Sequence, residues 1–407
     1  MKNIKEPKFR PELVWDQLRE AYWLEAPDVD GDSRPDIVGY GLTMGEIYWY
    51  KNESPKWTRN LALQGMKMPI GMDFADITGD GFADIVICYD LYGAKGRIDD
   101  PAPLGGKIDW LENPGNNPGN IQWKRHYIGQ EVGMHRLRVG HFSQSDKWEV
   151  FGAPIVGLND VFECLPIALF TEPEDVRKEW EKEIIDSSTF RFIHEVEKLA
   201  GKISSSPLES LLIASDEGVT WMYFEEKSKN WKKVKIGSGE LTQFSKTGFK
   251  GAGNANVGSI GDDNFAYVVS VEPFHGNTLA VYCKPHGVPP QVATWKRIIL
   301  DVFGDPNELG EGPCHHVVCA DFDGDGDDEF LVALRGPYPW QGVFYYKAID
   351  AENGQFLKWR VSSESTARIS VGDFTGNGKL DFATIGYKVK HYYEAEDAKV
   401  MLFVNEF

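Results

Sequence analysis

The sequence of 407 residues predicts an all-β protein, folded as a single seven-bladed β-propeller with four strands in each blade. Three observations favour this fold. An acidic turn recurs along the chain, apolar runs flank its copies, and Gly, Pro and aromatic residues are abundant. Seven copies in 407 residues give about 58 residues per unit, enough for four short strands with their loops. Repetition of such units around a ring leaves few exposed strand edges.

The acidic turn starts with Asp in its clearest copies and leads directly into an apolar run. These copies span residues 28–36, 76–84, 321–329 and 373–381, and the runs that follow include IVICY and FLVAL. Looser copies precede the runs VFGAPIV, LLIAS and FAYVVSV. Each turn joins the innermost strand of a blade to the second strand, so all of them are expected on one face. The seven turns start near residues 28, 76, 141, 200, 259, 321 and 373.

The rest of each unit supplies the outer strands, and segments rich in Tyr or Trp, such as EIYWYKN and GVFYYKA, are the candidates. The last segment, Lys399–Asn405, is expected to pair with N-terminal residues and close the ring. The charged segment Glu172–Ile185 departs from the β pattern and predicts a short surface helix. Seven units occupy residues 1–407 as one domain, so no cupin or lectin domain is expected.

Composition argues against several classes of partner. The chain has 43 basic and 62 acidic residues and a formal charge of −19, which disfavours binding to nucleic acid or to anionic membrane surfaces. No window approaches the ~20 apolar residues of a membrane span, and the N-terminus lacks the apolar core of a secretory signal. The five cysteines are scattered without a CxxC motif. We therefore expect reduced thiols and a cytoplasmic location.

The acidic turns place oxygen ligands at positions 1, 3, 5 and 9, which is the pattern that a Ca²⁺ or Mg²⁺ loop requires. Such loops resemble the Ca-binding repeats of integrin-type propellers. The best candidates are the four acidic side chains of the sixth turn, Asp321, Asp323, Asp325 and Glu329. The alternative is a turn that is satisfied by backbone N–H groups without an ion. His141 and Ser259 replace the first Asp of their turns, so an ion is not expected there.

The opposite face collects histidines. Counting six residues back from each turn start reaches the point where the chain enters the innermost strand, at the channel mouth. The seven positions are Tyr22, Ile70, His135, His194, Gly253, His315 and Ala367. A further residue, His275, follows the second strand of blade five and opens on the same face. Three imidazoles can bind a catalytic zinc that keeps an open position, and a fourth is then free for proton transfer.

One alternative remains for these histidines. Scattered His side chains often cap strands or bind backbone carbonyls without any metal. His316 follows His315 directly, so strand alternation predicts that it points to the opposite side and has a structural role.

Several segments carry a family resemblance. Gly133–Leu137 (GMHRL), Trp110–Gly115 (WLENPG), Phe274–Thr278 (FHGNT) and the segment from His315 to Gly326 look like the propeller domain of aldos-2-ulose dehydratase, also called 1,5-anhydro-D-fructose dehydratase. This resemblance implies a zinc ion at the propeller mouth. Carried over by position, it implies His194, His275 and His315 as zinc ligands and His135 as the acid/base.

The resemblance also implies a reaction, the elimination of water from a 2-keto sugar such as 1,5-anhydro-D-fructose. Loss of the C3 proton and the C4 hydroxyl would give an ascopyrone-type enone, which makes the chain a candidate carbon–oxygen lyase. The family's enzymes continue into cupin and lectin-like domains, so the later isomerisation is not expected here. The alternatives are a non-catalytic carbohydrate-binding propeller and a lyase that acts on keto-glycosides or uronates.

The expected partner is a small keto-sugar, and a homodimer is possible. Five residues near the mouth are candidates for contacts with sugar hydroxyls or with the ring face, and packing is the alternative for each. They are Tyr22, Trp23, Asp90, Arg136 and Asn277.

Overall fold

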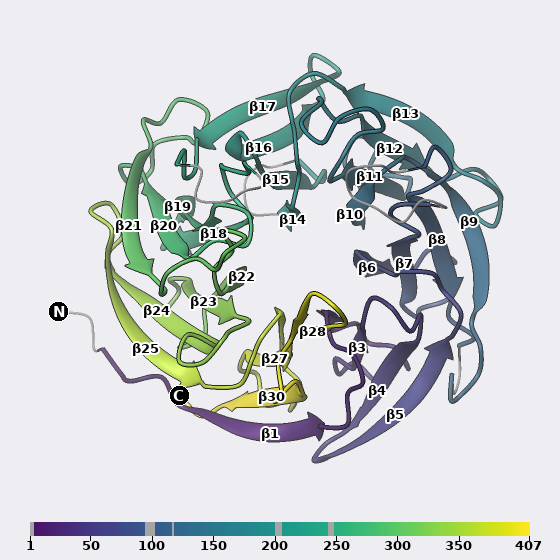
Figure 1. Ribbon diagram of the computed structural model, residues 1–407, viewed down its shortest axis with the longest axis horizontal. Helices are drawn as coiled ribbons and strands as arrows, with labels where there is room; N and C mark the ends of the chain where they lie inside the picture. The colour runs from purple at the N-terminus through teal and green to yellow at the C-terminus, as the bar shows by residue number, and fades with distance from the viewer. Residues whose placement is uncertain (1–3, 94–101, 116–117, 200–205, 243–247) are drawn as a thin grey trace.

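The computed structural model describes the chain except residues 1–3, 94–101, 116–117, 200–205 and 243–247. Seven four-stranded antiparallel sheets surround a central channel, so the predicted seven-bladed propeller is confirmed (Figure 1). No helix occurs among the described residues, and so none of them supplies a helical membrane span.

The blades share one strand order, from the channel outwards. The inner strands are β2 (Trp23–Glu25), β6 (Met72–Ala75), β10 (Met134–Gly140), β14 (Glu195–Leu199), β18 (Asn254–Ile260), β22 (Cys314–Ala320) and β26 (Arg368–Gly372). The second strands are β3 (Ile37–Tyr40), β7 (Asp84–Tyr89), β11 (Glu149–Pro154), β15 (Ser210–Ser215), β19 (Asp263–Glu272), β23 (Glu329–Leu334) and β27 (Asp381–Ile385). The third strands are β4 (Ile47–Glu53), β8 (Lys107–Glu112), β12 (Ile167–Thr171), β16 (Gly218–Glu225), β20 (Thr278–Cys283), β24 (Gly342–Asp350) and β30 (Val400–Asn405).

The outer strands complete the sheets. They are β5 (Lys56–Leu63), β9 (Lys124–Gln130), β13 (Glu181–Asp186), β17 (Asn230–Gly237), β21 (Lys296–Val302), β25 (Gln355–Ser362) and β1 (Phe9–Trp15). A short hairpin of β28 (Lys388–Val389) and β29 (Tyr393–Glu394) is inserted between the second and third strands of blade seven.

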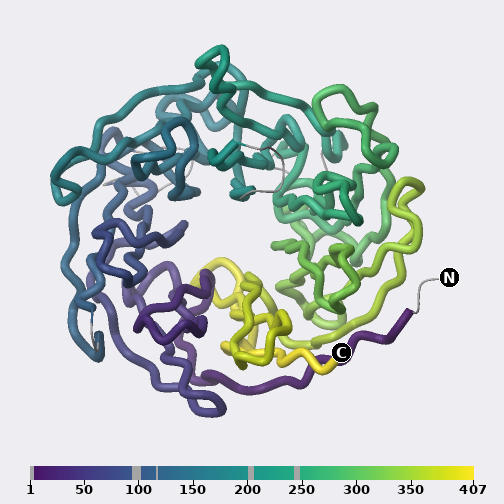
Figure 2. The backbone as a smooth tube through the Cα atoms, turned by 180° about the vertical axis from the view of Figure 1, so that it is seen from behind, coloured from purple at the N-terminus to yellow at the C-terminus, as the bar shows by residue number. Residues whose placement is uncertain are grey.

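The ring closes through the two ends of the chain. Strand β1 pairs antiparallel with β30, with Phe9 opposite Asn405 and Leu13 opposite Met401. The expected pairing of the last segment with N-terminal residues is therefore confirmed. Figure 2 shows the purple N-terminal segment and the yellow C-terminal segment side by side at the rim. Blade seven thus combines three C-terminal strands with one N-terminal strand.

The predicted helix over Glu172–Ile185 is wrong. Residues 174–178 form turns and bends, and the rest of the segment leads into the outer strand β13, which pairs with β12. Its charged side chains are mostly exposed because an outer strand faces water on both sides. Trp180 is the buried anchor, and its indole donates a hydrogen bond to the carbonyl of Val176.

The acidic turns satisfy their own backbone. In blade one, the carboxylate of Asp28 accepts the N–H groups of Gly31, Asp32 and Ser33, and buried Asp36 accepts the N–H of Val29. Asp321 and Glu329 make the corresponding bonds in blade six. The turn expected near residue 200 falls on residues 200–205, outside the described part of the chain.

Backbone hydrogen bonds define the channel mouth at the opposite end of the inner strands. In five blades the mouth residue donates its N–H to a carbonyl near the end of the second strand. The five residues are Tyr22, Ile70, His194, Gly253 and Ala367. In the other two blades, a register shift lies between Met134 and Arg136 and between Cys314 and His316. His135 and His315 therefore sit at β-bulges, which re-aim side chains.

Candidate metal centre at the channel mouth

Four imidazoles converge at the channel mouth. Those of His194, His275 and His315 have ring centroids 4.8, 5.1 and 5.8 Å apart, and the ring of His135 lies 5.4 Å from that of His194. All four side chains are buried, with exposed fractions between 1% and 6%. They come from blades three, four, five and six, so four consecutive blades build one site.

Hydrogen bonds at Nδ1 fix the rings of the three clustered histidines. Nδ1 of His194 lies 2.5 Å from the carbonyl oxygen of Gly253, and Nδ1 of His315 lies 2.6 Å from that of Ala367. Nδ1 of His275 lies 2.8 Å from the hydroxyl of Tyr392. A carbonyl oxygen accepts only, so Nδ1 carries the proton in His194 and His315 and leaves the lone pair on Nε2.

The remaining nitrogens form a potential metal site. One nitrogen from each of His194, His275 and His315 lies within 4.8 Å of the other two. The Nε2 atoms of His275 and His315 are buried and have no hydrogen-bond partner among the described residues. Buried polar atoms normally have a partner, so these two indicate a missing ligand. Three neutral imidazoles, each held through its other nitrogen, fit a zinc ion.

The surroundings keep these rings neutral. Burial, followed by the charge of the nearby Arg136 guanidinium, lowers the pKa of His194 to about 3. Burial also lowers the pKa values of His275 and His315 well below their usual range, with Arg335 adding to the effect on both. A neutral imidazole is the form that binds metal, so the site is ready for a cation without first losing protons.

His135 stands outside the group of three. Its Nε2 accepts a hydrogen bond from Arg136 at 3.1 Å, and its Nδ1 is buried without a partner among the described residues. Burial, followed by the charge of Arg136, lowers the pKa of His135 well below its usual range. The same guanidinium donates to Glu195 at 3.2 Å and to the hydroxyl of Tyr22 at 3.1 Å.

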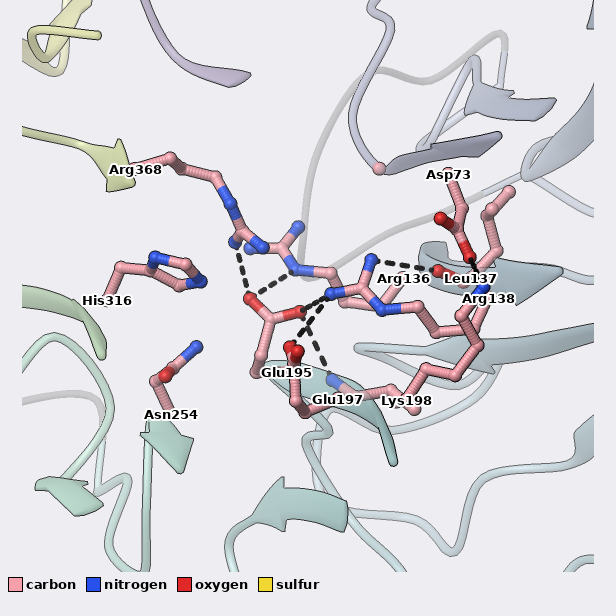
Figure 3. Close-up of polar contacts among 12 residues, drawn as sticks. Asp73, Arg136, Leu137, Arg138, Glu195, Glu197, Lys198, Asn254, His316 and Arg368 are labelled. Atoms are coloured by element: carbon pink, nitrogen blue, oxygen red, sulfur yellow. Dashed lines mark hydrogen bonds and ion pairs between the residues drawn. The ribbon is translucent and has the colours of Figure 1, made fainter. Parts of the chain in front are cut away.

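A layer of charged side chains follows His135 and His194 along the inner strands, and Figure 3 shows its members, among them Arg136, Arg138, Glu195 and Arg368. The carboxylate of Glu195 is 1% exposed and accepts from Arg136 and Arg368, while Arg138 lies 3.5 Å away. Burial alone would raise the pKa of Glu195, but the three guanidinium groups hold it well below its usual range. Further down, a cavity of about 310 Å³ is lined by charged side chains of both signs, including those of Glu25 and Glu197.

The prediction that His316 points to the opposite side of its strand from His315 is wrong. Nδ1 of His316 accepts the N–H of Ile369, while His315 binds the carbonyl of Ala367, so both rings face the inner strand of blade seven. The β-bulge between Cys314 and His316 cancels the alternation. His316 also lines the lower cavity, whereas His315 belongs to the mouth.

The five candidate substrate contacts have different surroundings. The hydroxyl of Tyr22 and the guanidinium of Arg136 lie beside the histidines. Trp23 is fully buried under the guanidinium of Arg368, 3.7 Å from the ring centroid. Asp90 forms ion pairs with Lys67 and Lys107, and Asn277 donates to the carbonyl of Gly304. The structure thus brings two of the five directly to the imidazole cluster.

Sequence reasoning missed a group of residues behind His275. Tyr392 binds its Nδ1, Glu311 accepts from the Tyr392 hydroxyl at 2.5 Å, and Arg335 donates to Glu311 at 2.9 Å. One pattern pointed there: the tyrosine-rich segment YKVKHYYE follows the second strand of blade seven, so it opens on the histidine face just as FHGNT does in blade five.

On the opposite face, the acidic turn of blade six forms ion pairs with a lysine side chain of the same blade. The ammonium of Lys347, on β24, lies 2.6 Å from Asp323, 2.9 Å from Asp325 and 2.8 Å from Glu329. The Lys347 side chain is 2% exposed. Three of the four candidate Ca²⁺ or Mg²⁺ ligands therefore already pair with a buried positive charge.

Comparisons with known proteins agree with this architecture. Residues 105–285 match the family model of the aldos-2-ulose dehydratase β-propeller domain, and residues 28–87 match that of the FG-GAP-like repeat. The chain is 37% identical over 424 residues to the aldos-2-ulose dehydratase of Phanerodontia chrysosporium. That alignment covers 98% of this chain and 46% of the relative, so the chain spans about half of the relative's length.

A solved structure supports the fold alone. The crystal structure of an ancestral GH74 enzyme aligns with a TM-score of 0.53 and 10% identity, over 91% of this chain and 45% of that chain. The sequence match carries more weight than this structural match, because its identity is higher and it extends over nearly all seven blades. The resemblance of the GMHRL and FHGNT segments is therefore confirmed: this chain is similar, over nearly its whole length, to about half of an aldos-2-ulose dehydratase, and residues 105–285 match the model of that family's β-propeller domain.

Proposed function

We propose that this propeller is a zinc-dependent dehydratase that eliminates water from a 2-keto sugar such as 1,5-anhydro-D-fructose. The product would be an ascopyrone-type enone. The observation that carries the proposal is the set of three neutral, buried imidazoles, each with a ring nitrogen within 4.8 Å of a ring nitrogen of the other two. The name of the related enzyme supports the class of reaction, and the donor set supports the metal.

His194, His275 and His315 would hold the ion and leave a position open for substrate. Zinc bound there would act as a Lewis acid and stabilise negative charge on the C2 oxygen of the keto sugar. The chain itself contributes a dry, preformed site, since all three rings are buried and fixed through Nδ1. Fixed donors in a water-poor site stabilise developing charge without reorganisation.

His135 would transfer the proton between C3 and the departing C4 hydroxyl. In the free protein its Nε2 accepts a hydrogen bond from Arg136, so the lone pair of that nitrogen is already engaged. When a sugar hydroxyl takes over the Arg136 donor, Nε2 is released and can accept the C3 proton. Glu195 favours the protonated ring and opposes the effect of Arg136 on the pKa of His135. One imidazole can then serve as base and as acid in succession.

Tyr22 and Arg136 would bind substrate hydroxyls. Their polar groups already bond to each other beside the imidazoles, so they can exchange that bond for one to a sugar. Arg136 is buried and held by Glu195, which keeps its guanidinium in place for a small ligand. A polar pair of this kind suits a neutral polyhydroxyl substrate.

The test is direct. The purified chain, loaded with zinc, is incubated with 1,5-anhydro-D-fructose while the absorbance of a conjugated enone is followed. We expect enone formation that stops when a chelator removes the metal and returns when zinc is restored. Full activity of a metal-free preparation would refute the Lewis-acid role, and no enone from the loaded protein would refute the reaction.

A further inference from the structure

His275 is held differently from its two partners. His194 and His315 donate Nδ1–H to backbone carbonyls of the next blade, which the propeller repeat itself places. His275 lies in a loop with a φ of +44°, a left-handed conformation that non-glycine residues rarely adopt. Its Nδ1 meets a side chain instead, the hydroxyl of Tyr392, which is 117 residues away in the sequence. The orientation of this ring therefore depends on a distant part of the chain.

That distant part is the hairpin of β28 and β29. Figure 1 shows β28 reaching inwards from blade seven to the channel. Arg335 of blade six anchors the hairpin, because its guanidinium lies 5.2, 5.5 and 5.3 Å from the ring centroids of Tyr387, Tyr392 and Tyr393. The same guanidinium donates to Glu311 at 2.9 Å. Residues of blades six and seven thus meet behind an imidazole of blade five.

The direction of the hydrogen bonds is fixed by chemistry. A tyrosine phenol is protonated near neutral pH, since its ordinary pKa is about 10. A carboxylate only accepts, so the Tyr392 hydroxyl donates to Glu311, 2.5 Å away. The phenol oxygen is then left to accept Nδ1–H from His275, 2.8 Å away, whereas the guanidinium of Arg335 lies farther off, at 3.4 Å from both Nδ1 and the phenol oxygen. This order places the His275 lone pair on Nε2, the atom that is buried without a partner among the described residues.

We propose that Tyr392 is a positioning residue for the metal centre, and that its relay to Glu311 sets the tautomer and the ring orientation of His275. The inference rests on the proposed function, because it takes the three imidazoles as metal ligands. Metal affinity would then depend on the blade-seven hairpin, although no residue of that hairpin binds the metal. Loss of a hydrogen-bond partner behind a metal-binding histidine typically weakens metal binding by about 10–100-fold.

The experiment compares Tyr392→Phe with Tyr393→Phe. Both substitutions keep an aromatic ring against Arg335, and only the first removes the hydroxyl that meets His275. Zinc affinity is measured by competition with a chromophoric chelator on the full chain, and the unfolding temperature of each metal-free variant is recorded. The visible absorption spectrum of the Co²⁺-loaded protein reports the geometry of the ligands.

We expect Tyr392→Phe to lose about 10–100-fold in zinc affinity and to change the Co²⁺ spectrum, with the unfolding temperature of the metal-free protein unchanged. Tyr393→Phe should match the wild type in all three measurements. A second variant, Glu311→Gln, keeps an acceptor without the charge and should show a smaller loss of affinity than Tyr392→Phe.

Equal zinc affinity and equal Co²⁺ spectra for Tyr392→Phe and wild type would overturn the inference and leave the zinc proposal standing. An equal loss in Tyr393→Phe would also overturn it, because the hairpin would then act through packing alone. A wild-type chain that binds no zinc would instead remove the zinc centre itself. The failure of the inference and the failure of the proposed function are therefore distinguishable.

Discussion

The Nδ1 atom of His194 lies 2.5 Å from the carbonyl oxygen of Gly253, the residue at the equivalent position of the next blade. His315 and Ala367 repeat this relationship one blade pair further on, at 2.6 Å. The propeller repeat therefore orients two imidazoles by backbone geometry alone. This arrangement also makes the backbone at Gly253 part of the site, although glycine has no side chain to contribute.

Gly253→Ala tests the contribution of the backbone at Gly253 to the site without removing a ligand. A Cβ at this position would lie 3.1 Å from the carbonyl oxygen of Pro273 and 3.3 Å from the nitrogen of His275. The His275 loop must shift by a few tenths of an ångström, so we expect a several-fold loss of zinc affinity in a chelator competition. Gly372→Ala is the control, because its Cβ would be equally tight, at 3.0 Å from Pro35, on the turn face. Equal effects of the two substitutions would contradict a local cause.

His275→Ala should lower the zinc content and abolish turnover while the fold is kept. The side chain is buried in a loop between strands rather than in a core cluster, and removing it leaves two ligands, fewer than a catalytic zinc site uses. Metal analysis of the purified variant and its circular dichroism spectrum are the measurements. His126→Ala is the matched control, since His126 pairs with Glu112 on the outer part of blade two. Normal zinc content in His275→Ala would exclude it as a ligand.

Metal binding should be nearly independent of pH between 7.5 and about 5. Burial lowers the pKa of His194 to about 3 and those of His275 and His315 well below the usual 6.5, so protons do not compete for these nitrogens in that range. Exposed histidines with a pKa of about 6.5 would each take up a proton on acidification, and affinity would fall steeply below that pH. Zinc affinity measured by chelator competition across the range distinguishes the two cases. A steep loss between pH 6.5 and 5.5 would contradict neutral, prearranged imidazoles.

Periodicity explains why the sequence could predict the fold and the four histidines. The spacing of the acidic turns defines the blades, and a fixed offset from each turn reaches the channel mouth, where Tyr22, His135, His194 and His315 lie. His275 was reached by a different route, from the face on which its loop opens. These inferences need only local pattern and topology, which a repeat makes regular.

The parts that could not be predicted break the repeat or join distant segments. The β-bulge between Cys314 and His316 reverses the direction of the His316 side chain, and no residue pattern in the sequence predicts this bulge. In the sequence, nothing distinguishes Glu195 from the many other acidic residues. Its role becomes visible only in the folded protein, where the inner strands place three arginines around it. The contact of Tyr392 with His275 spans 117 residues. The charged outer strand β13 looked helical because exposed edge strands and surface helices share a polar composition.

Lys347→Met should destabilise the protein and make its stability depend on calcium. The substitution removes the buried ammonium from Asp323, Asp325 and Glu329, which leaves three neighbouring carboxylates without a counter-charge. Breaking a buried pair of this kind costs about 3–5 kcal/mol. Thermal unfolding with and without Ca²⁺ measures the effect, and Ca²⁺ should restore part of the lost stability in the variant only.

Lys51→Met is the control for Lys347→Met, because Lys51 pairs with Asp30 from a side chain that is 37% exposed. An exposed pair contributes about 1 kcal/mol or less, so this variant should unfold close to the wild-type temperature. If Ca²⁺ stabilises the wild type as much as Lys347→Met, an ion binds the turn beside the lysine, and the ammonium is not its substitute.

His135→Asn separates metal binding from proton transfer. The ring of His135 lies outside the three-nitrogen group, and an Asn side chain keeps an oxygen that can accept from Arg136. Zinc content and sugar binding should therefore stay at wild-type levels. An amide cannot exchange a proton near neutral pH, so turnover should fall by at least ~10²-fold, the usual contribution of general acid–base catalysis.

Exchange of the substrate C3 hydrogen with solvent is the decisive readout for His135→Asn, because it reports proton abstraction even when elimination does not follow. It should vanish in the variant and persist in Tyr22→Phe, which removes a proposed substrate-binding hydroxyl but keeps the imidazole of His135. Loss of metal from His135→Asn would make His135 a ligand. Persistent exchange with full metal content would make another group the base, and Asp90, Tyr22 or a zinc-bound water would be the next candidates to test.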